Sequence, residues 1–279
     1  MRVVGVSRDN SMITGAGGGL GLAGRAGTAG CWRGYGGRMG AYAVVVLAGG
    51  AARRMGGVDK PARPVGGRPM RDRVLAAVTD ATPRVLVGAA DVVPAGVLVV
   101  REDPPGGGPV AAAAAGLALL GPDTAVVALL AADLPLLTRA AIGDLLNHLD
   151  RETPDAEPAR GGLAPAPPAH GGLAPAPPAQ DGLVPAHGGL GDERRPDGAC
   201  FVDGNGRRQS LCGVWRVAAL RSALDRLTVE RGGSLSGAPV RALLAGLVVR
   251  EVAWSGEGPP PWFDCDTDED VRRAEEWAR

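Results

Sequence analysis

The sequence has 279 residues, and its 30 basic and 30 acidic side chains give a formal net charge of zero. This balance argues against a protein that coats nucleic acid or an anionic membrane. Aromatic residues make up only 3% of the chain, which disfavours a stacking platform for single-stranded nucleic acid. No apolar run reaches the roughly 18 residues that a membrane-spanning helix needs. We therefore expect neither nucleic acid nor membrane as a partner.

The four cysteines are widely spaced and form no CxxC pair. This spacing favours neither a disulfide framework nor a zinc site, and it is typical of a reducing, cytoplasmic location.

Glycine and proline are concentrated in two stretches that flank or interrupt the rest of the chain. Residues 1–40 contain 13 glycines, and residues 151–197 contain the decapeptide GGLAPAPPAH followed by its near copy GGLAPAPPAQ. Neither stretch has enough apolar residues to form a core, so we predict a flexible extension and a disordered insert. The segments 41–150 and 198–279 then form the nucleotide-binding half and the acceptor-side half of one domain.

The first half alternates between strand and helix patterns. Residues 42–48 form an apolar, β-branched run that ends at Gly49-Gly50, as in a buried parallel strand. We expect further elements in the order helix 69–78, strand 84–88, strand 96–100, helix 110–120, strand 124–131, and a helix capped by Thr138 that runs to 149. This order indicates an α/β fold with a mainly parallel sheet.

The second half begins with a hairpin. Asn205-Gly206 marks a turn between strands 198–203 and 210–217. We expect helices at 217–227 and 238–246, a strand at 247–254, and a final helix that starts with a capping box of Thr267 and Asp270.

The loop LAGGAARRMGGVDK, residues 47–60, follows the first strand and combines paired glycines with three cations. Backbone N–H groups at glycine can approach an anion closely, and Arg53, Arg54 and Lys60 suit a polyphosphate. Lys60 is the single lysine in a chain with 29 arginines, which singles it out. A solvated basic loop is the other interpretation of the same residues.

Two acidic residues follow strands of the same expected sheet. Asp133 is placed to hold a Mg²⁺ ion that also bridges phosphates, or else it is a turn residue between strand and helix. Asp103, in REDPPGGGP, can accept hydrogen bonds from a base or a ribose, or else it is a solvated loop acid. Ligands of such sheets bind at the carboxyl ends of the strands, where both residues lie.

The loop 47–60 resembles the signature of the molybdenum cofactor guanylyltransferases, the MobA-like nucleotidyltransferases. Four other segments are similar to motifs of this family, namely EDPPGGGP, AADLP, DGNGRRQSLCGVWR and FDCDTDEDV. The resemblance covers about 41–150 and 198–279. It implies a single domain with a three-layer, mainly parallel sheet of the Rossmann-like, nucleotide-diphospho-sugar-transferase type.

The resemblance also implies roles for particular residues. Those that would contact the guanine nucleotide are Leu47, Ala48 and Gly49 through their backbone, Lys60 at the phosphates, Asp103, and Asp133, which would also bind Mg²⁺. Arg54 would face the phosphates, so that Arg54, Lys60 and Asp133 are the expected catalytic residues. Many family members have Asn where this chain has Gly88.

The activity implied by the resemblance is transfer of GMP from GTP to molybdenum-molybdopterin with release of pyrophosphate. Mg²⁺ would be the cofactor, GTP and molybdopterin the substrates, and molybdoenzymes or other cofactor-assembly proteins further partners. Cytidylyl transfer to molybdopterin, guanylyl transfer to another phosphorylated molecule such as phospholactate, and a non-catalytic nucleotide-binding role are the alternatives. Gly50 favours GTP, because the family's cytidylyl branch usually carries Ala there.

Overall fold

A computed structural model of the chain describes residues 41–49, 60–90, 92–151 and 195–279. In this described part, seven strands form one sheet in the order β5-β4-β1-β6-β8-β7-β9. The strands are β1 (Ala43–Leu47), β4 (Arg84–Val87), β5 (Val97–Val100), β6 (Val126–Ala131), β7 (Gly198–Val202), β8 (Arg208–Arg216) and β9 (Val249–Ala253). The expected extension 1–40 lies outside the described residues, as does nearly all of the expected insert.

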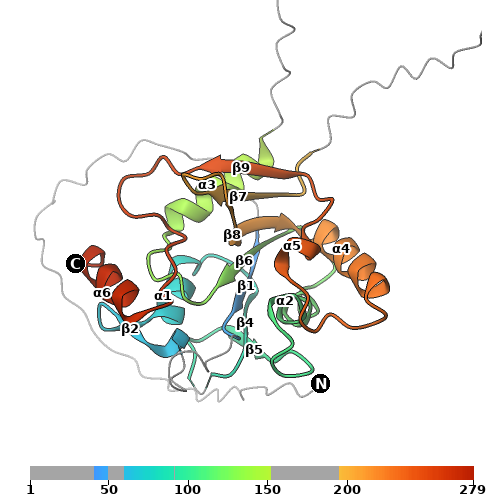
Figure 1. Ribbon diagram of the computed structural model, residues 1–279, viewed down its shortest axis with the longest axis horizontal. Coiled ribbons are helices and arrows are strands. Elements are labelled where there is room, and N and C mark those ends of the chain that lie inside the picture. The colour runs from blue at the N-terminus through green and yellow to red at the C-terminus, as the bar shows by residue number, and fades with distance from the viewer. Residues whose placement is uncertain (1–40, 50–59, 91, 152–194) are drawn as a thin grey trace, which may run out of the picture.

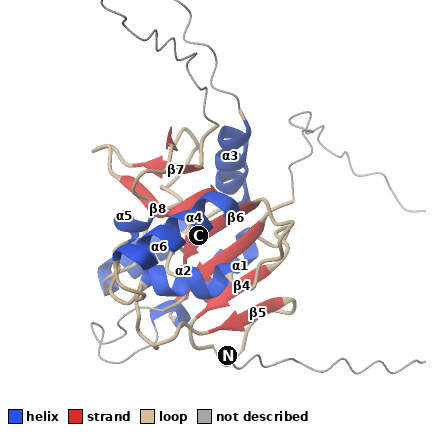
Figure 2. Cartoon of the chain, turned by 90° about the vertical axis from the view of Figure 1, so that its right-hand side faces the viewer, coloured by secondary structure: helices blue, strands red, loops and turns tan. Residues whose placement is uncertain are grey.

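Strand direction divides the sheet into two parts. Strands β5, β4, β1 and β6 are parallel to one another, and Val45 of β1 pairs with Val85 and Leu129. Strand β8 is antiparallel to both β6 and β7, and β9 is parallel to β7. The sheet is therefore mainly parallel, which confirms the α/β class predicted from the alternating pattern (Figure 2).

Helices cover both faces of the sheet and make three layers (Figure 1). Strand β1 is apolar at every position because both of its faces are buried. Val44 and Val46 pack into the core on one face of the sheet, and Val45 and Leu47 pack into the core on the other. One face packs against α1 (Met70–Ala77) and α3 (Arg139–Asp150), and the other against α2 (Pro109–Leu117), α4 (Val217–Glu230) and α5 (Val240–Leu243).

The last helix, α6 (Asp268–Trp277), packs away from the sheet against a small satellite core. Val65 and Met70 meet Cys265 and Val271 there, with Leu136 between the two groups. Around this core α6 contacts β2 (Pro64–Val65), and α1 contacts η2 (Lys60–Ala62) and β3 (Arg68–Pro69). This packing brings the C-terminal segment beside the residues that follow the loop 47–60.

The strand order contains a topological switch between β1 and β6. From β1 the chain moves outward to β4 and β5, and then returns to place β6 on the opposite side of β1. The carboxyl ends of β1 and β6 lie side by side at this switch, and ligands of such sheets bind in the crevice at this position. Ala48, Asp133 and their neighbours occupy this position.

Local signals in the sequence set most element boundaries. Thr138 caps α3 by accepting a hydrogen bond from the Ala141 N–H at 3.2 Å. Thr267 and Asp270 form the expected capping box of α6. The helix expected at 238–246 is reduced to the four residues of α5, because Gly246 adopts the left-handed conformation at φ 80°.

Candidate active site

The crevice at the carboxyl ends of β1 and β6 opens into a cavity of about 1190 Å³. Residues 47–49 and 131–134 line it from the parallel part of the sheet, and residues 206–212 and 239–247 line it from the second half. Trp262, Asp264 and Asp266 add a wall from the segment before α6. The cavity is thus built jointly by the two halves that the sequence analysis separates.

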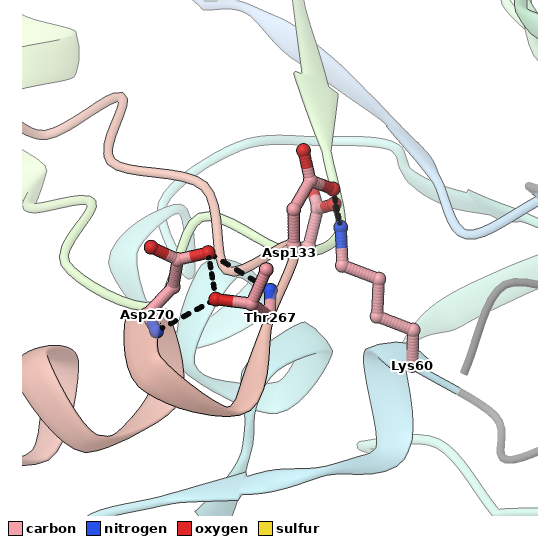
Figure 3. A network of polar contacts seen from close by, with 5 residues as sticks. Lys60, Asp133, Thr267 and Asp270 are labelled. Atoms are coloured by element: carbon pink, nitrogen blue, oxygen red, sulfur yellow. Dashed lines mark hydrogen bonds and ion pairs between the residues drawn. The ribbon is translucent and has the colours of Figure 1, made fainter. Parts of the chain in front are cut away.

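Lys60 lies between two carboxylates in this cavity. Its ammonium group donates hydrogen bonds to Asp133 Oδ2 and, at 2.6 Å, to Asp266 Oδ1. The side chains of Lys60 and Asp133 are only 19% and 21% exposed, whereas Asp266 is 73% exposed. Figure 3 shows Lys60 and Asp133 facing each other beside the start of α6. The structure therefore brings together two of the three expected catalytic residues and adds a carboxylate.

The environment of this group shifts two pKa values. Burial alone would lower the pKa of Lys60, but hydrogen bonds to Asp133 and Asp266 outweigh this effect and raise it above its ordinary value. Lys60 is therefore a permanent cation at neutral pH. Partial burial and the negative charge of Asp266 raise the pKa of Asp264.

The capping box of α6 fixes the position of Asp266. Asp270 Oδ2 accepts hydrogen bonds from the Thr267 N–H at 2.8 Å and from its hydroxyl at 2.7 Å, and Thr267 Oγ1 accepts from the Asp270 N–H. Arg63, the residue after η2, pairs with Asp268 at the start of α6 at 2.5 Å and forms a second link. Asp266 directly precedes this cap, so the cap helps to hold the Asp266 carboxylate at its contact with Lys60.

The backbone of Leu47, Ala48 and Gly49 lines the cavity where β1 ends. The Ala48 N–H donates to Val87 O at 2.8 Å, so this backbone is still held by the neighbouring strand. A side chain on Gly49 would begin 3.3 Å from Glu102 Oε1, which is tighter than usual. Gly49 therefore leaves open the space in front of the Glu102 carboxylate.

The structure separates Asp103 from this group. Its side chain is exposed and lines another cavity, of about 480 Å³, between α2 and the loop 233–236. Glu102, one residue earlier, is buried and faces Gly49. Neighbouring residues in an extended segment point to opposite sides, so only one of the two carboxylates can face the backbone after β1.

Arginine side chains line the part of the main cavity that the second half of the chain forms, which we call the hairpin wall. Arg207 and Arg208 come from the hairpin turn and the start of β8, and Arg241 comes from α5. Arg208 pairs with Glu251 at 2.7 Å. The guanidinium groups of Arg207 and Arg241 have no hydrogen-bond or ion-pair partner within the described residues. This wall therefore carries uncompensated positive charge.

Some expected site residues have no described position, and two site residues were not expected. Gly50, Arg53 and Arg54 lie outside the described residues, so the structure says nothing of their places. Glu102 and Asp266 were missed as site residues, although EDPPGGGP and FDCDTDEDV contain them. The signal for Asp266 was its place in FDCDTDEDV, which was interpreted as a segment similar to a family motif and as the start of a capped helix, without a role for Asp266 itself.

The model of the MobA-like NTP transferase domain family matches residues 44–248. The chain belongs to this family. It is thus a MobA-like nucleotidyltransferase, and the matched range includes the cavity residues on β1, β6 and the β7–β8 hairpin. A comparison with curated protein sequences gave no match.

Solved structures establish the fold of this MobA-like protein. The molybdopterin-guanine dinucleotide biosynthesis protein A of Archaeoglobus fulgidus superposes with a TM-score of 0.52 at 18% identity, and the match covers 84% of this chain and 96% of that one. The 2-C-methyl-D-erythritol 4-phosphate cytidylyltransferase of Thermus thermophilus gives 0.52 at 17% identity, with 85% and 98% covered. The 4-diphosphocytidyl-2C-methyl-D-erythritol synthase of Anaerococcus prevotii gives 0.52 at 11% identity, with 86% and 99% covered. The fold is that of the nucleotide-diphospho-sugar transferases.

None of the helices in the described part of this MobA-like chain is both long and apolar enough to cross a membrane.

Proposed function

We propose that this MobA-like nucleotidyltransferase transfers GMP from GTP to the terminal phosphate of molybdopterin and releases pyrophosphate. The observation that carries the proposal is one cavity with two differently charged walls. Lys60 and Asp266 gather around Asp133, which follows the parallel strand β6, and the guanidinium groups of Arg207 and Arg241 belong to the hairpin wall. Two anionic substrates that must meet at one phosphorus atom require such an arrangement.

The donor nucleotide belongs on the wall formed by the parallel strands. Backbone groups of Leu47, Ala48 and Gly49 would contact the nucleotide, and Lys60 would bind its phosphates. Arg54 would face the same phosphates from the preceding loop. Lys60 keeps its charge at neutral pH because its two carboxylate contacts raise its pKa, so it can neutralise charge that develops on phosphate oxygens.

The carboxylates on this wall fit a Mg²⁺ ion. Asp133 and Asp266 both contact the Lys60 ammonium, so their oxygens already converge on one cation. Mg²⁺ is commonly held by one or two carboxylates together with substrate phosphates, and it keeps some of its water. When bound, Mg²⁺ supplies positive charge to the phosphates. In its presence Lys60 would exchange a carboxylate partner for a phosphate oxygen.

The acceptor belongs on the wall that carries the arginines. Arg207 and Arg241 can bind its phosphate with paired N–H groups, which orients an oxygen toward the α-phosphorus of GTP. That oxygen forms a new P–O bond while the bond from the α-phosphorus to the pyrophosphate oxygen breaks, and the electron pair leaves with pyrophosphate. An attacking phosphate is already anionic at neutral pH, so no general base is needed.

The direct test incubates the full chain with Mg²⁺, either molybdopterin or phospholactate as acceptor, and either GTP or CTP, and measures pyrophosphate release and the product that carries the transferred nucleotide. We expect both products with GTP and little with CTP. A preference for CTP would make the protein a cytidylyltransferase. Turnover with phospholactate but not molybdopterin would change the acceptor. Nucleotide binding without turnover on either acceptor would support the non-catalytic role.

A further inference from the structure

Glu102 differs from every other charged side chain that the structure describes, because it alone is buried, with 7% of its surface exposed. A buried carboxylate is costly unless hydrogen bonds or a cation compensate it. Within the described residues, its one hydrogen bond comes from the Gly106 N–H to Oε1 at 3.0 Å, and no cation pairs with it. Most of the hydrogen-bonding capacity of this carboxylate is therefore unused.

The carboxylate lies directly behind the lining of the main cavity. A side chain on Gly49, which does line the cavity, would begin 3.3 Å from Glu102 Oε1. Gly49 ends the backbone segment that lines the main cavity after β1. A nucleotide whose phosphates reach Lys60 would place its base near this backbone and the loop after β5.

We infer that Glu102 selects the nucleobase of the donor by accepting hydrogen bonds from N1–H and the 2-amino group of guanine. The inference rests on the proposed function for the location of the nucleotide, and it adds the residue that determines base specificity. Glu102 Oε1 can keep the Gly106 N–H while both oxygens accept further bonds, because a carboxylate has about four acceptor positions.

The chemistry of the bases makes this contact selective. Guanine presents two adjacent donors, N1–H and the 2-amino group, on the edge that pairs with other bases. Cytosine presents one amino donor beside the lone pair of N3, and adenine one amino donor beside the lone pair of N1. A carboxylate facing either base would meet a lone pair, so a buried Glu102 favours GTP over CTP and ATP.

The test replaces Glu102 and measures binding with the full chain in the presence of Mg²⁺. In Glu102→Gln the amide oxygen can still accept hydrogen bonds from the Gly106 N–H and from N1–H of guanine. The amide NH₂, however, is a donor that faces another donor, the 2-amino group of guanine. Xanthine has a carbonyl oxygen at that position, which accepts from the amide. We therefore expect Kd for GTP to rise about 10–100-fold and Kd for XTP to fall by a similar factor, measured by titration calorimetry.

Two further measurements make the result specific. Wild-type protein should bind ITP, which lacks the 2-amino group, about tenfold more weakly than GTP, and Glu102→Gln should lose this difference. Glu276→Gln, an exposed Glu on α6 outside the main cavity, is the matched control and should keep the wild-type ranking. Thermal midpoints of all variants show whether each one folds.

The outcomes separate this inference from the proposed function. If wild type prefers GTP and Glu102→Gln folds but keeps that preference, Glu102 only holds Gly106 and the inference is wrong, while guanylyl transfer stands. If Asp103→Asn rather than Glu102→Gln changes the order of Kd values among the nucleotides, the exposed carboxylate of Asp103 selects the base and the inference is again wrong. If wild type prefers CTP, guanylyl transfer fails as well.

Discussion

Both walls of the cavity carry basic side chains, but only those on one wall are paired with carboxylates. On the wall of the parallel strands, Lys60 is already neutralised by Asp133 and Asp266. On the hairpin wall, Arg207 and Arg241 have no partner within the described residues. The difference suggests that the first wall must exchange internal partners for ligand groups, whereas the second can attract an anionic ligand directly.

The largest effect should follow from removing charge on the compensated wall. Asp133→Asn keeps the side-chain shape but loses the negative charge for a hard cation, and Lys60 keeps Asp266 as a partner. We expect kcat to fall by roughly 10²–10³-fold with little change in the thermal midpoint. Near-normal turnover at saturating Mg²⁺ would show that Asp133 is not the main metal ligand.

A smaller effect should follow from changing the shape of the cation on the same wall. Lys60→Arg keeps the charge, but a planar guanidinium cannot occupy the point between Asp133 and Asp266 that the ammonium occupies. A lost charge-assisted contact of about 1.5–3 kcal/mol corresponds to a fall of one to two decades in kcat/KM for GTP. Unchanged kinetics would mean that Lys60 provides only generic charge, and the contrast between the walls would weaken.

Substitutions on the hairpin wall should change KM for the acceptor and not binding of the nucleotide. Arg241→Ala and Arg207→Ala should each raise KM for the phosphorylated acceptor about tenfold and leave Kd for GTP unchanged. Arg272→Ala, on the exposed side of α6, is the matched control and should change neither value. A rise in Kd for GTP in the Arg241 variant would assign this wall to the donor instead.

The smallest effect should come from the cap that supports the compensated wall. Thr267→Ala removes the hydroxyl that accepts from the Asp270 N–H, which costs about 1 kcal/mol of unfolding free energy. Thr267→Ser keeps the hydroxyl and should stay near wild type. Denaturant unfolding of the two variants measures the difference. Equal midpoints would mean that the cap does not stabilise the fold.

Local patterns predicted the strands, most helices and both caps, because these depend on neighbouring residues. The apolar run of β1, the turn at Asn205-Gly206 and the capping Thr138 are of this kind. The cationic glycine loop and the carboxylate that follows a buried strand pointed to Lys60 and Asp133, the family resemblance implied roles for both, and the structure places them together.

The rest of the site depends on packing between distant segments. No local pattern shows that Asp266 reaches Lys60, because α6 returns to η2 through a satellite core. Glu102 and Asp103 are equally acidic neighbours, and only the direction of the backbone after β5 decides which one is buried. The antiparallel insertion of β8 beside β6 likewise requires the whole sheet.

The pair of Lys60 and Asp266 joins residues that are 206 positions apart, and the link of Arg63 to Asp268 spans 205. A chain emerging from the ribosome can assemble its parallel strands long before the segment around Asp266 is free to fold. During that interval Lys60 has Asp133 as its only carboxylate partner among these residues. Completion of this charged group is thus tied to the synthesis of the segment around Asp266, so a partly made chain can have the parallel strands but not the third charge beside Lys60 and Asp133.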